Sequence, residues 1–288
     1  MIPANFDYIA ANSLDEALSL LAKHKDDAKL LAGGHSLLPA MKLRLAQPKV
    51  LIDIGRIKDL SYIREEGGQI RIGATTTHFQ IETSDLLRRA CPLFPETAAH
   101  LGDMQVRNKG TIGGSLAHSD PAADWPAAVI AVSAEMVVAG AKGERVIKAD
   151  DFFVDLLTTA LQANEVLKEI RFAAPKGRTA QSYMKVRHPA SGFAVVGVAV
   201  NLSLDGAKSQ SAGVGITGVA PKAYRAKGVE SALKGNTLDA KTLSAAANHA
   251  ADGVSNAITE LFATGEYRKH LAEVYTRRAL ETAVSRAK

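Results

Sequence analysis

Two glycine pairs are the residues of this chain whose type and spacing most clearly suit chemistry, and both suit the binding of an anion. One pair lies within Ala32–Ser36 and the other within Thr111–Ser115. Because glycine has no Cβ and readily adopts positive φ, such loops can bring bare backbone N–H groups against a phosphate. Neither stretch is a GxGxxG or Walker sequence, so Rossmann and P-loop sites are not indicated. Either pair alone could simply form a tight turn, but a diphosphate between the two would account for both.

The elements around these stretches are those expected of a ligand-binding loop. The apolar run 28–32 predicts a strand that leads into the first glycine pair, and a short helical or extended piece follows at 37–41. The run 126–132 predicts a buried helix after the second pair, with a proline in its first turn. Asp120, just before Pro121, is expected to turn the chain.

The remaining sequence predicts three regions. The first is a small α/β unit, the second an α+β unit with a largely antiparallel sheet, and the third a set of strands followed by helices. A linker rich in proline and glycine at 173–178 precedes the third region. The expected elements are a helix at 14–23 and a strand at 50–54; strands at 70–74 and 134–138 with helices at 84–89 and 94–102; and strands at 193–204 and 212–218 with helices beginning near Tyr224, Asp239 and Glu266.

Composition narrows the class of protein. The net charge of +5 comes from scattered basic residues without interleaved aromatics, which argues against a nucleic-acid-binding face. No apolar run approaches the ~18 residues needed to span a bilayer, and residues 1–11 lack the pattern of a secretory signal, so we expect a cytoplasmic protein. The single cysteine, Cys91, excludes an internal disulfide and cannot hold an iron–sulfur cluster. Its apolar context predicts an inert core thiol, and the eight histidines show no metal-ligand spacing.

Together with the residues around them, the two glycine stretches resemble segments of a known protein family. LAGGHSLLPAMKLRLA (31–46) and VRNKGTIGGSLAHSDPAADWP (106–126), in this order and spacing, are similar to the FAD-binding medium subunits of the molybdenum hydroxylases. The similarity is to the carbon monoxide dehydrogenase branch, extends to the flavin domain of xanthine dehydrogenase, and covers nearly the whole chain. It implies an α+β fold, with a two-part FAD-binding domain of the PCMH type (a small α/β unit, 1–55, and a larger mainly antiparallel α+β unit, 56–175). A C-terminal domain with a small antiparallel sheet and a helical bundle (179–288) follows.

The resemblance also implies which residues meet a non-covalently bound FAD. The first stretch wraps the pyrophosphate and adenosine side, and the second meets the flavin-proximal phosphate and ribityl chain. Asp124 accepts hydrogen bonds from FAD hydroxyls, although it could also cap the helix that follows. Lys185 lies near the redox edge and would raise the flavin potential, unless it is a solvated strand lysine. The implied set is Leu31, Ala32, Gly33, Gly34, His35, Ser36, Leu37, Leu101, Thr111, Ile112, Gly113, Gly114, Ser115, Asp124, Leu167 and Lys185.

Individual side chains in this set carry narrower expectations. Leu167, in EVLKEIRF, and Leu101 are apolar residues that would pack on the isoalloxazine ring. The His35 ring either lies near the ligand or hydrogen-bonds its own backbone, and the Ser36 hydroxyl could add a bond. Relatives often carry asparagine in place of Ser115, so the resemblance implies backbone contacts there but not the amide side-chain contact.

The function implied by the resemblance is that of an electron-transferring subunit. Molybdenum cofactor on a large partner subunit would oxidise the substrate, [2Fe-2S] clusters on a small partner would carry electrons, and FAD on this chain would pass them to an external acceptor, in a dimer of heterotrimers. The absent large subunit would select the substrate, and no catalytic base or metal site is expected here. Two alternatives remain, namely a free-standing flavin reductase, for which we find no proton donor, and a non-catalytic nucleotide-binding scaffold.

Overall fold

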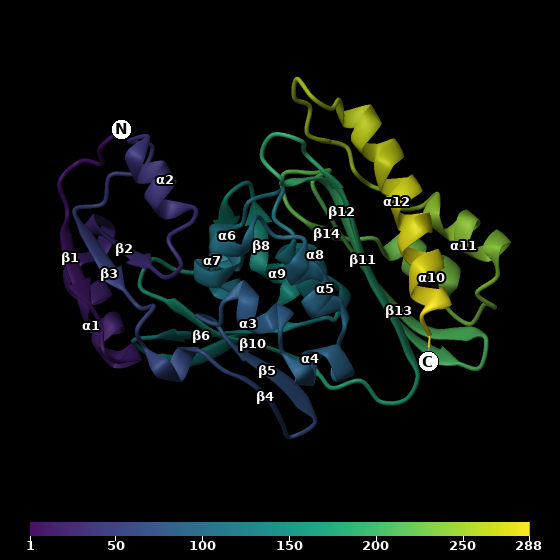
Figure 1. Cartoon of the computed structure of the whole chain (residues 1–288), viewed down its shortest axis with the longest axis horizontal. Helices are drawn as coiled ribbons and strands as arrows, with labels where there is room; N and C mark the ends of the chain where they lie inside the picture. The colour runs from purple at the N-terminus through teal and green to yellow at the C-terminus, as the bar shows by residue number, and fades with distance from the viewer. Residues whose placement is uncertain (288) are drawn as a thin grey trace.

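The computed structural model describes residues 1–287 and arranges them around three main sheets in chain order (Figure 1). The first sheet is parallel, with strand order β1-β3-β2. Helix α1 packs on it through Ala17 and Leu21, and Ser13 caps this helix by accepting from Glu16 N at 3.1 Å. The elements of this unit are β1 Asp7–Ala10, α1 Leu14–His24, β2 Ala28–Leu31, α2 Leu37–Lys42 and β3 Val50–Asp53.

The second unit is built on an antiparallel five-stranded sheet with the order β4-β5-β10-β6-β7. Strand β10 arrives last in the chain and lies between β5 and β6, so the unit closes only when its final strand is placed. Short helices cover one face. The elements are β4 Ile63–Glu66, β5 Gln69–Gly73, α3 His78–Glu82, α4 Asp85–Ala90, α5 Leu93–Ala99, α6 Met104–Lys109, α7 Ile112–His118, α8 Trp125–Ala131, β6 Glu135–Gly140, β7 Gly143–Lys148, α9 Ala149–Phe152, β8 Phe153–Asp155, β9 Thr158–Thr159 and β10 Val166–Ala173.

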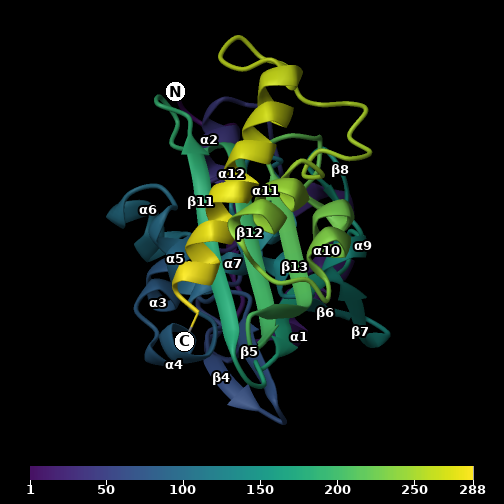
Figure 2. The same cartoon turned by 90° about the vertical axis from the view of Figure 1, so that its right-hand side faces the viewer.

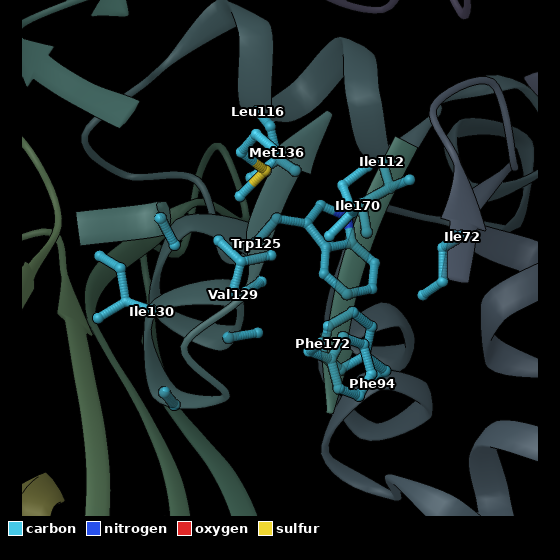
Figure 3. Close-up of a cluster of buried hydrophobic side chains, with 14 of the residues drawn as sticks. Ile72, Phe94, Ile112, Leu116, Trp125, Val129, Ile130, Met136, Ile170 and Phe172 are labelled. Atoms are coloured by element: carbon cyan, nitrogen blue, oxygen red, sulfur yellow. The ribbon is translucent and has the colours of Figure 1, made fainter. Parts of the chain in front are cut away.

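Trp125 occupies the centre of the second unit's core. Its side chain is fully buried, and the Phe94 ring lies 5.5 Å from it, measured between ring centroids (Figure 3). Ile72 and Ile170 contribute from neighbouring strands of the sheet. Cys91 belongs to this core as expected, and burial raises the pKa of its thiol to about 12. The covering helices are therefore held to the sheet by one continuous apolar core.

The third unit is an antiparallel sheet of order β11-β12-β13-β14, and α12 lies across β11 and β12 (Figure 2). The expected helix near Tyr224 begins only at Lys227. Tyr224 and Arg225 instead pair with β13, because the Arg225 guanidinium is held there by Asp150 and Glu230. The elements are β11 Thr179–Arg187, β12 Ala194–Asp205, β13 Lys208–Thr217, β14 Tyr224–Arg225, α10 Lys227–Leu233, α11 Ala240–Ala247 and α12 Gly265–Ser285.

Helix α8 of the second unit packs against β13 of the third unit with its backbone in direct contact with the strand. A Cβ placed on Gly213 would lie 2.0 Å from the Ala131 carbonyl oxygen, and one on Gly215 would lie 2.1 Å from the Ala127 carbonyl oxygen. The helix can therefore rest directly on β13.

The architecture as a whole is the expected α+β fold, with a small α/β unit, a mainly antiparallel α+β unit and a C-terminal sheet with helices. No helix within residues 1–287 is both long and apolar enough to cross a membrane.

Candidate functional site

The two glycine stretches lie side by side although they come from different units. A Cβ placed on Gly33 would lie 2.3 Å from the Lys109 carbonyl oxygen and 2.7 Å from Gly110 Cα. A Cβ placed on Gly114 would lie 3.9 Å from the Ala32 Cβ. The first stretch therefore rests on the segment that leads into the second, as a shared ligand requires.

The first stretch presents backbone donors that the protein does not use. It follows the edge strand β2 and turns at Gly34, whose φ is +78°. Within residues 1–287, the N–H groups of Gly33, Gly34, His35 and Ser36 donate to no protein acceptor. Four adjacent free N–H groups, in a place where a side chain at Gly33 would collide, suit the phosphate oxygens of a dinucleotide.

The polar side chains of the first stretch also make no hydrogen bonds with protein within residues 1–287. In the described part of the chain, neither the His35 ring nor the Ser36 hydroxyl makes a hydrogen bond with protein, and Ser36 does not cap α2 through its side chain. The interpretation of His35 as a ring bonded to its own backbone is therefore wrong. Both side chains remain free to meet a ligand.

The second stretch forms the beginning of α7. The Thr111 hydroxyl caps this helix by accepting from Gly114 N at 3.1 Å, and the Thr111 carbonyl oxygen accepts from Ser115 N at 3.1 Å. The expectation of bare N–H groups is therefore not met at these two positions. A helix start satisfies them internally, which the glycine pair alone did not reveal.

The next two N–H groups of the second stretch are bound to the end of β5 and the turn after it. Ile112 N donates to the Thr76 carbonyl oxygen at 3.1 Å, and Gly113 N donates to the Ala74 carbonyl oxygen at 2.8 Å. A Cβ on Gly113 would lie 2.5 Å from the Ala74 Cβ, so glycine is required here for close packing. The second stretch is a rigid wall of the site. Its N–H groups from Ile112 to Ser115 have protein acceptors, whereas Thr111 N donates to none within residues 1–287.

His78 holds the second stretch against the core. Its backbone N–H donates to the Gly110 carbonyl oxygen at 3.0 Å, and its Nδ1 accepts from Trp125 Nε1 at 3.1 Å. Burial, with smaller contributions from His35 and Arg107, lowers the pKa of His78 to about 4. The ring is therefore neutral near pH 7, and the proton that Nδ1 lacks must be on Nε2.

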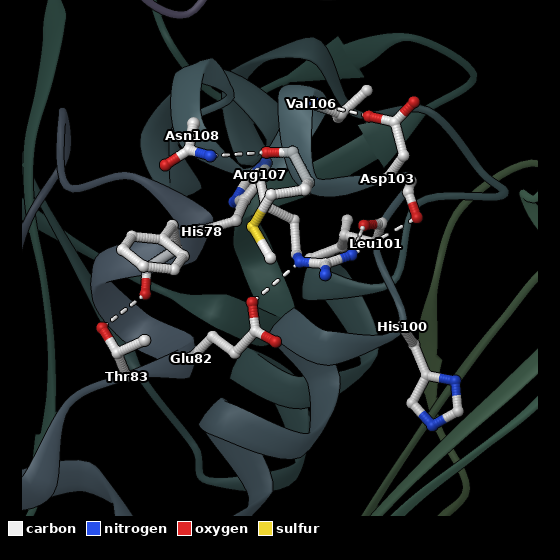
Figure 4. A network of polar contacts seen from close by, with 12 residues as sticks. His78, Glu82, Thr83, His100, Leu101, Asp103, Val106, Arg107 and Asn108 are labelled. Atoms are coloured by element: carbon white, nitrogen blue, oxygen red, sulfur yellow. Dashed lines mark hydrogen bonds and ion pairs between the residues drawn. The ribbon is translucent and has the colours of Figure 1, made fainter.

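Arg107 fixes the segment that carries Leu101. Its Nε donates to Glu82 at 2.7 Å, and one terminal nitrogen donates to the Leu101 carbonyl oxygen at 3.0 Å (Figure 4). The Leu101 side chain is half-buried against the core of the second unit. The turn between α5 and α6, which begins at His100, is thereby held in place, and the His100 carbonyl oxygen accepts from Lys185 Nζ.

Asp124 and Lys185, both predicted site residues, form a buried ion pair. Lys185 Nζ donates to Asp124 Oδ2 at 2.9 Å and to the His100 carbonyl oxygen at 3.3 Å. The Lys185 side chain is 1% exposed and that of Asp124 is 3% exposed, so the interpretation of Lys185 as a solvated strand lysine is wrong. Asp124 precedes α8 but makes no capping bond, so that alternative is wrong as well. Both of its oxygens are used elsewhere, since the other accepts from Tyr183.

Burial and pairing act in opposite directions on these two charges. Burial raises the pKa of Asp124, and the neighbouring Lys185 and Tyr183 lower it again. Burial lowers the pKa of Lys185, and Asp124 raises it. Each charge is therefore stabilised chiefly by its partner, as is usual for ions that have lost their water.

Comparison with known proteins agrees with this geometry. A family model described as "FAD binding domain in molybdopterin dehydrogenase" matches residues 4–175, and one described as "CO dehydrogenase flavoprotein C-terminal domain" matches residues 181–283. The chain belongs to the family of FAD-binding medium subunits of molybdenum hydroxylases. The carbon monoxide dehydrogenase medium chain of Hydrogenophaga pseudoflava is 42% identical over 99% of both chains, and that of Afipia carboxidovorans is 38% identical over 100% of both.

A solved structure extends the similarity to three dimensions. The carbon monoxide dehydrogenase from Hydrogenophaga pseudoflava that lacks the Mo-pyranopterin moiety of its cofactor matches with a TM-score of 0.96, at 42% identity and full coverage of both chains. Like that medium-subunit family, this chain is an oxidoreductase subunit with an FAD-binding domain.

Within this FAD-binding subunit, the remaining predicted residues have mixed surroundings. Leu167 is 5% exposed and packs in the same core as Ile112, beside the second stretch. Asp120 turns the chain as expected, since its Oδ1 accepts from Ala122 N at 2.8 Å.

Two residues beside the site, His78 and Tyr183, were not predicted from the sequence. Only Tyr183 had a visible signal, because it lies two residues before Lys185 and shares its face of the strand.

Proposed function

We propose that this chain holds FAD non-covalently as the medium subunit of a molybdenum hydroxylase. In this proposal it receives electrons from a molybdenum centre through [2Fe-2S] clusters and passes them to an external acceptor. The molybdenum cofactor belongs to a large partner subunit and the clusters to a small one, in a dimer of heterotrimers. Cys91 is the only cysteine of the sequence, so cluster thiolates must come from another chain.

The observation that carries the proposal is the row of free N–H groups from Gly33 to Ser36, packed against the segment before Thr111. FAD, when bound, supplies the redox chemistry. The chain's own residues bind its phosphates through the first stretch and wall off one side with α7. Substrate selection belongs to the large subunit.

The site residues and domain limits form part of the same proposal. The proposed domains are residues 1–55, 56–175 and 179–288, and the proposed location is the cytoplasm. The proposed FAD contacts are Leu31, Ala32, Gly33, Gly34, His35, Ser36, Leu37, Leu101, Thr111, Ile112, Gly113, Gly114, Ser115, Asp124, Leu167 and Lys185.

A flavin analysis tests the first part of the proposal. The purified full chain, reconstituted with excess FAD and freed of unbound ligand, should be yellow and should release FAD on denaturation. FMN has one phosphate and would leave the adenosine side of the site empty. Release of FMN, or of no flavin, contradicts the assignment.

A reconstitution experiment tests the partner subunits. The chain by itself should contain negligible molybdenum and iron, and its flavin should be reducible by dithionite and reoxidisable by an artificial acceptor. Addition of the iron–sulfur and molybdenum subunits should restore reduction of the flavin by substrate. Substrate-dependent bleaching of the metal-free chain alone would instead indicate a self-sufficient flavoenzyme.

A further inference from the structure

Tyr183 is a fully buried tyrosine on β11 that has no role in the function proposed above. Side chains two residues apart on a strand share a face, so Tyr183 and Lys185 both point toward the start of α8. The Tyr183 hydroxyl donates to Asp124 Oδ1 at 2.5 Å, while Lys185 Nζ donates to Oδ2 of the same carboxylate at 2.9 Å. One carboxylate therefore joins the tyrosine to the lysine.

The position of the hydroxyl depends on a glycine of the next strand. Gly197 on β12 pairs with Lys185, and a Cβ placed on it would lie 2.4 Å from the Tyr183 hydroxyl oxygen. The His100 ring meets the edge of the Tyr183 ring with 5.5 Å between centroids. The phenol is thus held on both sides, and within residues 1–287 its hydroxyl has one hydrogen-bond partner, Asp124.

The bond from Tyr183 stabilises the charged form of its partner. Burial raises the pKa of Asp124, and the Tyr183 hydrogen bond, together with Lys185, opposes that rise. An ionised Asp124 in turn opposes the burial that lowers the pKa of Lys185. The other charged or titratable groups facing this cluster are His100, Glu96 and Arg187. Loss of the hydroxyl therefore weakens the counter-ion of the buried ammonium group.

Resting on the proposed function, we propose that Tyr183 is a positioning residue of the flavin site, whose hydroxyl keeps Asp124 ionised and in place so that Lys185 remains a cation beside the flavin. Because the ammonium group is buried, its field reaches the flavin through protein of low dielectric constant rather than through water. A nearby cation favours the more electron-rich flavin and raises its reduction potential. Tyr183 then tunes that potential without touching FAD.

A double-mutant cycle tests this role in the FAD-loaded full chain. Tyr183→Phe should shift the flavin midpoint potential to a more negative value, measured by spectroelectrochemical titration, with FAD retained. In a Lys185→Met background, the same change should produce no further shift, because the charge through which Tyr183 acts is gone. Tyr62→Phe is the matched control, since it removes another tyrosine–carboxylate bond, from Tyr62 to Glu169 at 2.6 Å, on the sheet of the second unit.

The outcomes separate this inference from the function on which it rests. An unchanged potential in Tyr183→Phe, an equal shift in both backgrounds, or a similar shift in Tyr62→Phe overturns the positioning role and leaves FAD binding intact. A shift confined to the background that retains Lys185 supports it. A wild-type chain that binds no FAD after reconstitution overturns the proposed function, and this inference falls with it.

Discussion

The two glycine stretches share a dipeptide and differ in how their backbone N–H groups are used. In the first stretch, the groups from Gly33 to Ser36 have no protein acceptor within residues 1–287. In the second, the groups from Ile112 to Ser115 all have one. The glycine pair supplies close approach in both stretches, but the first offers a row of four free donors and the second only Thr111 N. The first is thus equipped mainly to bind and the second mainly to support.

The surroundings of each stretch explain this difference. The first leaves β2, the edge strand of the parallel sheet, so no further strand offers carbonyl groups to it. The second begins a helix beside the end of β5, where the carbonyl groups of Ala74 and Thr76 are available. Whether a glycine loop can bind an anion therefore depends on the acceptors that the fold places nearby.

The largest effect is expected from Gly33→Ala. The new Cβ would overlap the Lys109 carbonyl oxygen, now 2.3 Å from that position, so the two stretches must separate. We expect FAD affinity to fall by about 100-fold, or about 3 kcal/mol, measured by fluorescence titration of the apo-chain. Gly140→Ala is the control, because its nearest neighbour is the flexible Glu165 side chain at 3.3 Å. Wild-type affinity in Gly33→Ala would contradict a binding role for the first stretch.

Lowering the pH should destabilise the folded chain, because it protonates His78, which holds the second stretch against the core. Its pKa is about 4 in the folded chain and near 6.5 in the unfolded chain, so the unfolded chain binds more protons between these values. The contribution of His78 to the free energy of unfolding is therefore fully present above pH 6.5. It falls by about 3 kcal/mol as the pH drops to 4. Urea denaturation across this range should show the loss in wild type.

Two variants isolate the His78 contribution. His78→Asn keeps an acceptor for Trp125 but cannot titrate, so its acid loss should be smaller by about 3 kcal/mol. His270→Asn replaces an exposed histidine and is the control for the substitution itself. Identical profiles for His78→Asn and wild type would contradict a neutral, buried His78.

Gly113→Ala should affect folding more than binding, the reverse of Gly33→Ala. Its Cβ would lie 2.5 Å from the Ala74 Cβ, inside the packed contact between α7 and the end of β5. Overpacking of this kind costs about 1–3 kcal/mol, which the midpoint of urea unfolding of the apo-chain would report. If Gly113→Ala lost FAD affinity at unchanged stability, Gly113 would act chiefly through contact with FAD and not through its packing on Ala74.

The smallest effect is expected from Thr111→Ala. It removes the hydroxyl that caps α7 at Gly114 N and should cost about 1 kcal/mol of stability. Thr111→Ser retains the hydroxyl and should remain near wild type. The comparison of their unfolding midpoints tests whether α7 depends on this cap. Equal midpoints for the two variants would show that it does not.

The sequence predicted those parts of the fold that depend on local patterns. The run that became α1 was recognised within one residue of its end, because its apolar spacing and its caps are local. The placement of β10 between β5 and β6 had no local signal, since it depends on pairing with strands far away in the chain. The helix expected near Tyr224 begins three residues later, at Lys227, for the same reason, because Asp150 holds Arg225 from a distant segment.

The candidate site likewise has features that the sequence could predict and features that only the fold reveals. The nearness of the two stretches could be inferred from the family resemblance, but not the use of their N–H groups, which depends on neighbours such as Ala74. Asp124 and Lys185 were singled out separately, and their pairing required the fold. The bond between His78 and Trp125 joins residues with no common motif, and a lone histidine in sequence gives no indication of such a partner.

The contact of α8 with β13 also limits how the site can open. Shear between packed elements normally occurs through side chains that re-interdigitate. At Gly213 and Gly215 no side chain lies between the strand and the carbonyl groups of Ala127 and Ala131. The second and third units therefore lack a side-chain layer in which to slide at this contact, so the site does not open by shear between α8 and β13.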